Sequence, residues 1–146
     1  MTALLTYFTA AISVSFLCSL LESVLLSLSI AHVSVMEKEG QPSGKLIAEL
    51  KGNINKPLAA ILTINTIANT VGAAGVGAQT LLIFGNEWVA FSSGVLTLCI
   101  LIFSEIIPKT IGAIYCRSLA PFSAYVIRIL MVIAWPFVLF SEKMSK

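Results

Sequence analysis

The sequence predicts an all-α membrane protein with three transmembrane helices plus a re-entrant or in-plane juxtamembrane belt helix. Of its 146 residues, 58% are hydrophobic and only 11% are charged. Soluble domains are closer to about 45–50% apolar and about 25% charged residues. The mean hydropathy of +0.97 also indicates a lipid environment. This length allows three or four spans of about 20 residues each, so we expect one transmembrane domain over residues 1–146.

The first two spans are expected over about 4–36 and 57–84. The first apolar run is longer than a bilayer requires, so we expect it to be tilted, to be bent or to extend beyond the lipid. The polar residues 37–56 contain a Gly-Gln-Pro-Ser-Gly turn and the stretch KLIAELKG, which predicts a short amphipathic helix at the interface. The second span opens on Pro57, which suits the first turn of a helix. Its second half contains three glycines that predict close helix approach or local unwinding: Gly72, Gly75 and Gly77.

The third span is expected over about 88–117, after a tight Gly-Asn-Glu link. Trp88 is a typical interfacial anchor, and Pro108 predicts a kink because it cannot donate to the preceding turn. The belt helix is expected over about 119–140. It contains Arg128, and an uncompensated arginine in mid-bilayer costs at least ~2.5–3.5 kcal/mol. A true fourth span is the alternative for this segment.

The basic residues predict the orientation. With three spans and an outer N-terminus, all nine Lys and Arg residues lie on or near the cytoplasmic side, as does the C-terminus. We expect the plasma membrane of a bacterium or archaeon. The net charge of +2 does not favour a nucleic-acid partner, and no motif favours an enzyme. The three cysteines lie in apolar runs and are expected to be reduced and buried.

Polar residues form one face on each span. In the first span this face includes serines and an acid at helical spacing, and the second and third spans carry amides and another acid. Counting 1.5 Å per residue from the inner ends at about residues 37, 56 and 117, the acids and one amide lie at a similar depth of ~18–22 Å. The residues are Ser15, Ser19, Glu22, Ser23 and Ser27; Asn65 and Asn69; and Ser104 and Glu105.

These groups are hard oxygen ligands. An ionised carboxylate in lipid must be protonated, paired or bound to a cation. Hydroxyl, amide and carboxylate oxygens suit Mg²⁺, Ca²⁺ or Na⁺ better than zinc or copper. Because Pro108 cannot donate to the Ser104 carbonyl, that carbonyl is a further candidate. The alternatives are that the serines bond to their own backbone or across to a neighbouring helix, and that the asparagines only bond helices together. Glu22 can also pair with Lys109 or cap a helix, and Lys109 can reach the inner interface.

Three motifs resemble the transmembrane domain of the cyclin-M/CorC family of magnesium transporters. FLCSLLESVLLSLS is similar to the family's first-span pattern, TINTIANT to its asparagine-containing segment, and SEIIPKTIGA to its Gly-Glu-Ile-x-Pro-Lys-x-x-Ala signature. The resemblance departs from the family pattern at Leu21, Ile64 and Ser104. It implies a homodimer in the lipid bilayer with a dehydrated Mg²⁺ between the three spans. The implied ligands are Ser19, Ser23, Asn65, Asn69 and Glu105, supported by Glu22, Pro108 and Lys109.

The resemblance implies Mg²⁺ efflux coupled to Na⁺, by alternating access. The alternative is a non-transporting membrane anchor or regulatory subunit, in which buried polar residues only pack helices. The family's cytoplasmic CBS-type domains are absent from this chain. Either the chain is a truncated piece, with regulatory domains missing or supplied elsewhere, or it is a natural short relative. Transport direction, counter-ion, affinity and dimer face stay open at this point.

Overall fold

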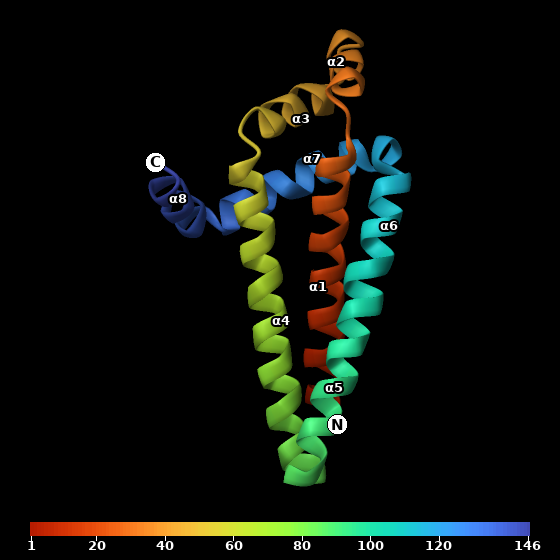
Figure 1. Ribbon diagram of the computed structural model, residues 1–146, viewed down its shortest axis with the longest axis vertical. Helices are drawn as coiled ribbons and strands as arrows, with labels where there is room; N and C mark the ends of the chain where they lie inside the picture. The colour runs from red at the N-terminus through yellow and green to blue at the C-terminus, as the bar shows by residue number, and fades with distance from the viewer.

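Three long helical segments lie side by side and form the body of the molecule (Figure 1). The computed structural model describes residues 1–146, and it contains helices and no strands. The third long segment consists of α5, η2 and α6 in direct succession. The elements are α1 (Thr2–Ser27), α2 (Ile30–Lys38), α3 (Pro42–Gly52), α4 (Asn55–Phe84), η1 (Asn86–Trp88), α5 (Val89–Cys99), η2 (Ile100–Ile106), α6 (Ile107–Ile114), α7 (Cys116–Ile133) and α8 (Trp135–Met144).

The first apolar run does not form one span over 4–36. α1 ends at Ser27, and Leu28 adopts an extended conformation with φ −67° and ψ 124°. The hydroxyl of Ser29 then accepts a hydrogen bond from the His32 backbone N–H and caps α2. Lys51 from α3 donates to the carbonyls of Leu25 and Leu28, two acceptors near the end of α1. The hydropathy of the sequence is uniform across the end of α1, so it did not predict that end. The helix ends there because Ser29 caps the next helix and Lys51 binds carbonyls at the end of α1.

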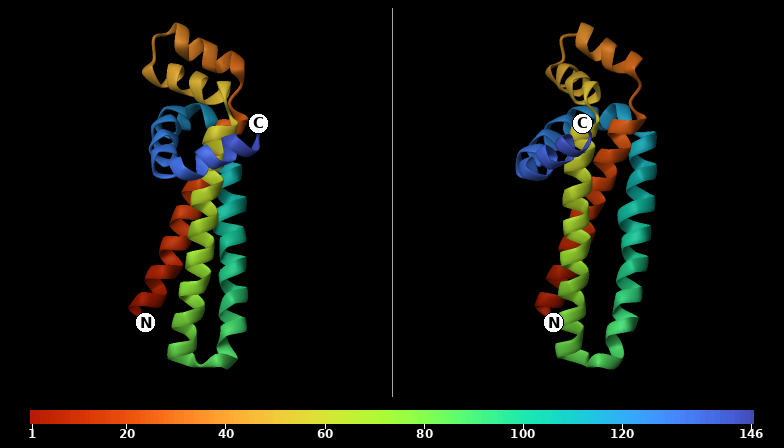
Figure 2. Two further views of the ribbon diagram at one scale, coloured as in Figure 1. Left: turned by 90° about the vertical axis from the view of Figure 1, so that its left-hand side faces the viewer. Right: turned by 60° about the vertical axis from the view of Figure 1, so that its left-hand side comes forward.

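α2 and α3 form a helical hairpin above one end of the bundle (Figure 2). The amphipathic helix expected over KLIAELKG is confirmed as part of α3, which Pro42 begins. Leu46, Ile47 and Leu50 are buried and join a 15-residue hydrophobic cluster with α1 and α7. The main core therefore lies at the α2–α3 end of the molecule.

Small residues bring α1 close to both neighbours. A Cβ atom added to Gly72 of α4 would lie 2.3 Å from the Cβ of Ala11, and one added to Gly75 would lie 2.4 Å from the Tyr7 ring. A Cβ added to Gly112 of α6 would lie 2.7 Å from the Cβ of Ser23. Gly72 and Gly75 thus confirm the expected close approach, and α4 remains helical throughout.

The third long segment contains a π-helical section. The Ile107 N–H donates to the Ile102 carbonyl five residues before it, and Pro108 follows in the first turn of α6. A kink was expected at Pro108, because proline has no N–H to donate. The structure instead has backbone hydrogen bonds over five residues just before Pro108, where an α-helix has them over four. The Ser104 hydroxyl donates to the Ile12 carbonyl of α1 at 3.0 Å and ties this section to α1.

Four helical segments, not three, are long and apolar enough to cross a membrane: Thr2–Ser27, Asn55–Phe84, Asn86–Ile114 and Cys116–Ile133. The expectation of three spans plus a belt helix therefore undercounts them. α7 qualifies because Arg117 and Arg128 lower the average hydropathy of its 18 residues only to 1.5. α7 nevertheless runs across the end of the three-helix bundle instead of along it (Figures 1 and 2).

Candidate metal site

Two interhelical contacts align the three long segments at one level. Gly72 of α4 lies against Ala11 of α1, and Ser104 of η2 bonds to the Ile12 carbonyl of α1. From this level, Asn69 lies three residues away along α4, or ~4.5 Å, and Glu105 directly follows Ser104. The structure thus places Asn69 and Glu105 within about one turn of the same level.

Four oxygen atoms on α1 and α4, from this level to ~12 Å beyond it toward the α2–α3 end, are buried and have no hydrogen-bond partner. Asn65 and Asn69 contribute their side-chain carbonyl oxygens, and Ser15 and Ser19 contribute hydroxyls of side chains that are almost completely buried. An unpartnered buried polar group costs about 1–3 kcal/mol. These four oxygens on two packed helices are therefore available to a ligand, as is the fifth oxygen of this kind, that of Ser123 on α7.

Other hydroxyls in the bundle do not behave this way. Thr63, Thr80 and Thr97 each donate to the carbonyl four residues earlier in their own helix, at 2.7–2.8 Å. This is the usual solution for a hydroxyl in an apolar helix. Ser15 and Ser19 lack this bond. The alternative in which a serine of this face bonds to the backbone of its own helix therefore does not apply to these two.

Ser15 was not in the predicted ligand set. It lies three residues from Ile12 along α1, which places it at the level of Asn69 and Glu105. Its sequence spacing of four from Ser19 put it on the same helical face, but only its burial without a partner distinguishes it from an ordinary back-bonded serine.

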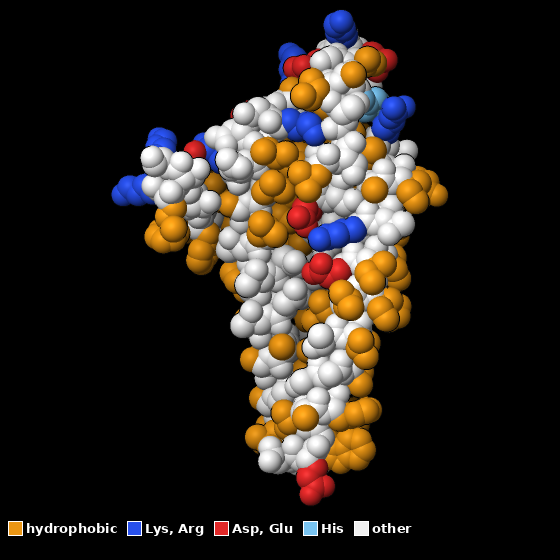
Figure 3. Space-filling view, in the orientation of Figure 1, with side chains coloured by type: hydrophobic (Ala, Val, Ile, Leu, Met, Phe, Trp, Pro, Cys, Tyr) orange, Lys and Arg blue, Asp and Glu red, His pale blue; other side chains and the backbone are white.

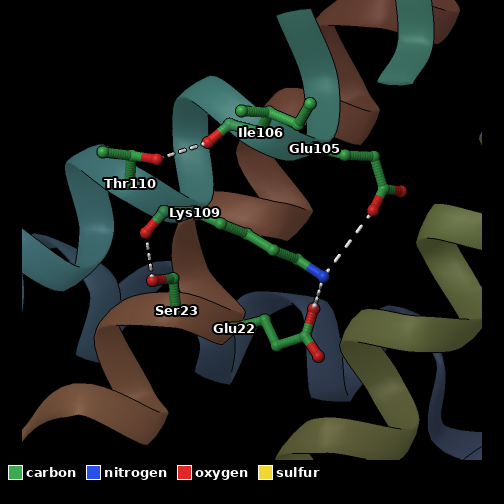
Figure 4. A network of polar contacts seen from close by, with 6 residues as sticks. All are labelled: Glu22, Ser23, Glu105, Ile106, Lys109 and Thr110. Atoms are coloured by element: carbon green, nitrogen blue, oxygen red, sulfur yellow. Dashed lines mark hydrogen bonds and ion pairs between the residues drawn. The ribbon is translucent and has the colours of Figure 1, made fainter. Parts of the chain in front are cut away.

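Glu105 belongs to a group of three charged side chains. The Lys109 ammonium lies 3.6 Å from a carboxylate oxygen of Glu105 and 3.6 Å from one of Glu22 (Figure 4). The pairing of Glu22 with Lys109 is thus confirmed. The three side chains carry a net charge of −1. Two carboxylates therefore share one cation, and one negative charge is left for another.

The predicted common depth was wrong for Glu22. That depth was counted from residue 37, whereas α1 ends at Ser27. Along α1, Glu22 lies seven residues, or ~10 Å, beyond Ser15 toward the α2–α3 end. The long side chain of Lys109 spans this separation, and Figure 4 shows both carboxylates directed toward its ammonium.

Ser23 and Pro108 have structural contacts in this arrangement. The Ser23 hydroxyl donates to the Lys109 carbonyl at 2.6 Å, so α1 fixes the backbone of α6 directly after Pro108. Pro108 is buried. A hydroxyl that donates its proton still has lone pairs for a cation, but Ser23 lies ~12 Å beyond Ser15 along α1, outside the level of Asn69 and Glu105. Ser23 differs from Ser19, whose oxygen has no partner.

The charged group opens on one side of the bundle. Figure 3 shows acidic and basic side chains partway along the bundle between α4 and α6, whereas most other charged side chains on this face gather at the α2–α3 and α8 end. The side chain of Lys109 is 47% exposed, that of Glu105 32% and that of Glu22 20%. The site therefore combines a dry set of neutral oxygens with a charged set that has an accessible side.

This donor set favours a hard cation. The candidate ligands are hydroxyl, amide and carboxylate oxygens, and no three His, Cys, Asp or Glu side chains gather as a metal cluster anywhere in the chain. Oxygen ligands with few charges suit Mg²⁺, Ca²⁺ or Na⁺, whereas zinc and copper select nitrogen and sulfur. The arrangement can hold a cation between α1, α4 and η2.

Comparison with known proteins identifies the family of the chain. Residues 6–146 match the family described as cyclin M transmembrane N-terminal domain. A UPF0053 protein of Synechocystis, sll1254, is 33% identical over 129 residues, which cover 88% of this chain and 37% of that protein. The UPF0053 inner membrane protein YfjD of Escherichia coli is 28% identical over 117 residues, which cover 80% of this chain and 27% of that protein.

The chain therefore spans roughly a third of the length of these relatives or less. Its match to the cyclin M description extends over nearly all of its residues, including the polar faces of all three long segments. The chain is an integral membrane protein with the helical transmembrane domain of the cyclin M family, and it belongs to that family.

Proposed function

We propose that this domain binds a dehydrated Mg²⁺ ion within the membrane and transports it. The observation that carries the proposal is a set of buried, unpartnered oxygens: those of Ser15 and Asn69 at about the level of Glu105, and those of Ser19 and Asn65 one helical turn further toward the α2–α3 end. Glu105 supplies the negative charge, and the other four supply neutral oxygens. Ser23 lies ~12 Å beyond Ser15 along α1, too far to bind the same ion, and its hydroxyl instead binds the Lys109 carbonyl.

The chemistry of Mg²⁺ favours a carrier. Mg²⁺ gives up its water slowly and prefers octahedral oxygen coordination. A site that replaces most of this water with protein oxygens binds the ion for longer than a fast pore allows, so we propose alternating access. We propose that the direction is efflux and that Na⁺ is the counter-ion. Na⁺ accepts the same kind of oxygen ligands as Mg²⁺, which suits it to the same site. A homodimer is the proposed assembly.

Charge and shape support a three-span placement with α7 and α8 in the membrane plane. α7 runs across the bundle end, and Phe122, Tyr125, Ile129 and Val132 form an exposed apolar face suited to lipid. Eight of the nine basic residues lie outside the long segments or at the α2–α3 end of α4, which we assign to the cytoplasm. They are Lys38, Lys45, Lys51, Lys56, Arg117, Arg128, Lys143 and Lys146.

Single-cysteine labelling tests this placement. In a variant without Cys18, Cys99 and Cys116, we expect Asn86→Cys to react with an impermeant thiol reagent from outside and Ser145→Cys only from the cytoplasmic side. If α7 crossed the membrane, both positions would react from outside. That result would contradict the in-plane placement.

The open side of the charged group supports the dimer. Charges exposed to hydrocarbon are costly, and a second copy on the α4–α6 side would cover them. Light scattering of the purified protein, corrected for bound detergent, measures the mass directly. A monomer mass at micromolar concentration would contradict the dimer.

Flux in proteoliposomes tests transport. We expect a fluorescent Mg²⁺ indicator inside the vesicles to report Mg²⁺ movement that depends on an imposed Na⁺ gradient and is absent from empty vesicles. The rival function is a membrane anchor without transport, since the domain covers only part of its relatives. Mg²⁺ movement equal to that of empty vesicles, in protein shown to be folded, would favour the anchor.

A further inference from the structure

Lys109 is unusual among the nine basic residues because it lies along the three-helix bundle. The other eight are at the α2–α3 end, on α7, on α8 or just after α8. Its ammonium contacts Glu105 from its own segment and Glu22 from α1, at 3.6 Å each. Lys109 therefore links the proposed metal ligand Glu105 to an acid that lies about two turns further along α1.

The backbone of Lys109 is held while its side chain is free to move. The Ser23 hydroxyl binds the Lys109 carbonyl, and the Thr110 hydroxyl bonds back to the Ile106 carbonyl at 2.8 Å (Figure 4). The side chain itself is 47% exposed and lies on the open side between α4 and α6. The ammonium can thus leave Glu105 by rotation of a flexible side chain, with no change in the helix.

We propose that Lys109 is a tethered counter-cation that pairs with Glu105 when Mg²⁺ is absent and is released from it when Mg²⁺ binds. This inference rests on the proposed Mg²⁺ site. Lys109 acts through Glu105 and is a positioning residue, not a ligand. The ammonium and the metal compete for the same carboxylate.

Charge counting supports the exchange. With Mg²⁺ beside Glu105 and the ammonium still on that carboxylate, two cations would share one acid. If the ammonium leaves Glu105, Glu22 remains its partner at 3.6 Å, and each acid then has its own cation. At distances of a few ångströms in a low-dielectric setting, repulsion between Mg²⁺ and the ammonium favours the exchange.

The exchange also compensates the empty site. Without Lys109, the ion-free domain would hold two carboxylates with no cation beside them, which is costly in a membrane. With Lys109 in place, the empty site carries only one unbalanced charge. The empty carrier can then change between its inward- and outward-facing states without a metal ion, and the cycle can continue.

Mg²⁺ titration calorimetry of Lys109→Gln tests the competition. We expect the dissociation constant to fall by about tenfold or more, because the competing charge is gone. Lys109→Arg keeps the charge and should bind within about threefold of the wild type. Lys143→Gln, the same change at an exposed site on α8, should leave affinity unaltered.

In proteoliposomes, Lys109→Gln should lower both KM and the maximal rate, since the ion binds more tightly but the empty site returns slowly.

A second measurement needs no variant. Acylation of Lys109 by an amine-reactive ester, followed by peptide mass spectrometry, should rise severalfold when MgCl₂ is added but not with choline chloride at equal ionic strength. If the wild type binds Mg²⁺ while Lys109→Gln binds it equally or more weakly, or Lys109 reactivity does not rise, the competition is refuted and the site stands. If the wild type itself shows no Mg²⁺ binding, the proposed site and this inference both fail.

Discussion

Glu105→Gln is expected to abolish the rise in melting temperature that Mg²⁺ produces in the wild type, and to abolish Mg²⁺ flux. The substitution removes the carboxylate charge among the proposed ligands and keeps the shape of the side chain. A ligand at 100 times its dissociation constant stabilises the folded state by about 2.7 kcal/mol, so the wild-type shift should amount to several degrees. Thermal unfolding in detergent with and without MgCl₂ measures it.

The fold should survive this change. Lys109 keeps Glu22 as a partner at 3.6 Å, so no buried charge is stranded. Glu142→Gln is the matched control, because Glu142 also pairs with a lysine, Lys56, at 3.0 Å, but on α8 and away from the proposed site. This substitution should leave the Mg²⁺ response intact. An equal Mg²⁺ shift in the wild type and in Glu105→Gln would show that the ion binds elsewhere.

Asn69→Leu is expected to separate stability from function. Leucine has nearly the shape of asparagine but removes a buried carbonyl oxygen that has no partner. The metal-free protein should gain about 1–3 kcal/mol of stability, the cost of such an unpartnered group. Mg²⁺ binding and flux should fall by at least tenfold, because a ligand of the proposed site is lost. Melting temperatures in EDTA and in MgCl₂ report both effects.

Thr63→Val on the same helix is the control for Asn69→Leu. The Thr63 hydroxyl already bonds to the Ala59 carbonyl at 2.7 Å, so its loss should not stabilise the protein or alter Mg²⁺ binding. If Asn69→Leu destabilises the metal-free protein as much as it weakens Mg²⁺ binding, the amide serves to pack helices and the anchor function gains support.

Part of the proposed site was predictable because helical spacing is a local property. The four-residue spacing of Asn65 and Asn69, and the acid next to Ser104, placed these groups on common faces before any packing was known. The pairing of Glu22 with Lys109 was one of two alternatives, and only the structure decided it. Ser15 was undervalued because its sequence neighbours are those of an ordinary membrane serine, and its lack of a partner depends on burial.

The end of α1 and the count of apolar helices were wrong for a related reason. Hydropathy averages along the chain, so it does not register a serine cap at Ser29 or a lysine that arrives from α3 to bind the Leu25 carbonyl. The same averaging conceals the direction of α7, whose composition allows a span although the helix runs across the bundle.

By itself, the sequence determined that this protein is an all-helical membrane domain with oxygen ligands on its long segments, because composition and helical periodicity act within each segment. Only the tertiary structure decided where the π-helical section lies against α1, which hydroxyls lack partners, and that Lys109 stands between two acids. These features depend on contacts across great sequence distances, such as Ser23 with Lys109, 86 residues apart, and Ser104 with Ile12, 92 residues apart. Such contacts form only when the helices pack, and packing determines which polar groups are satisfied and which remain free to bind an ion.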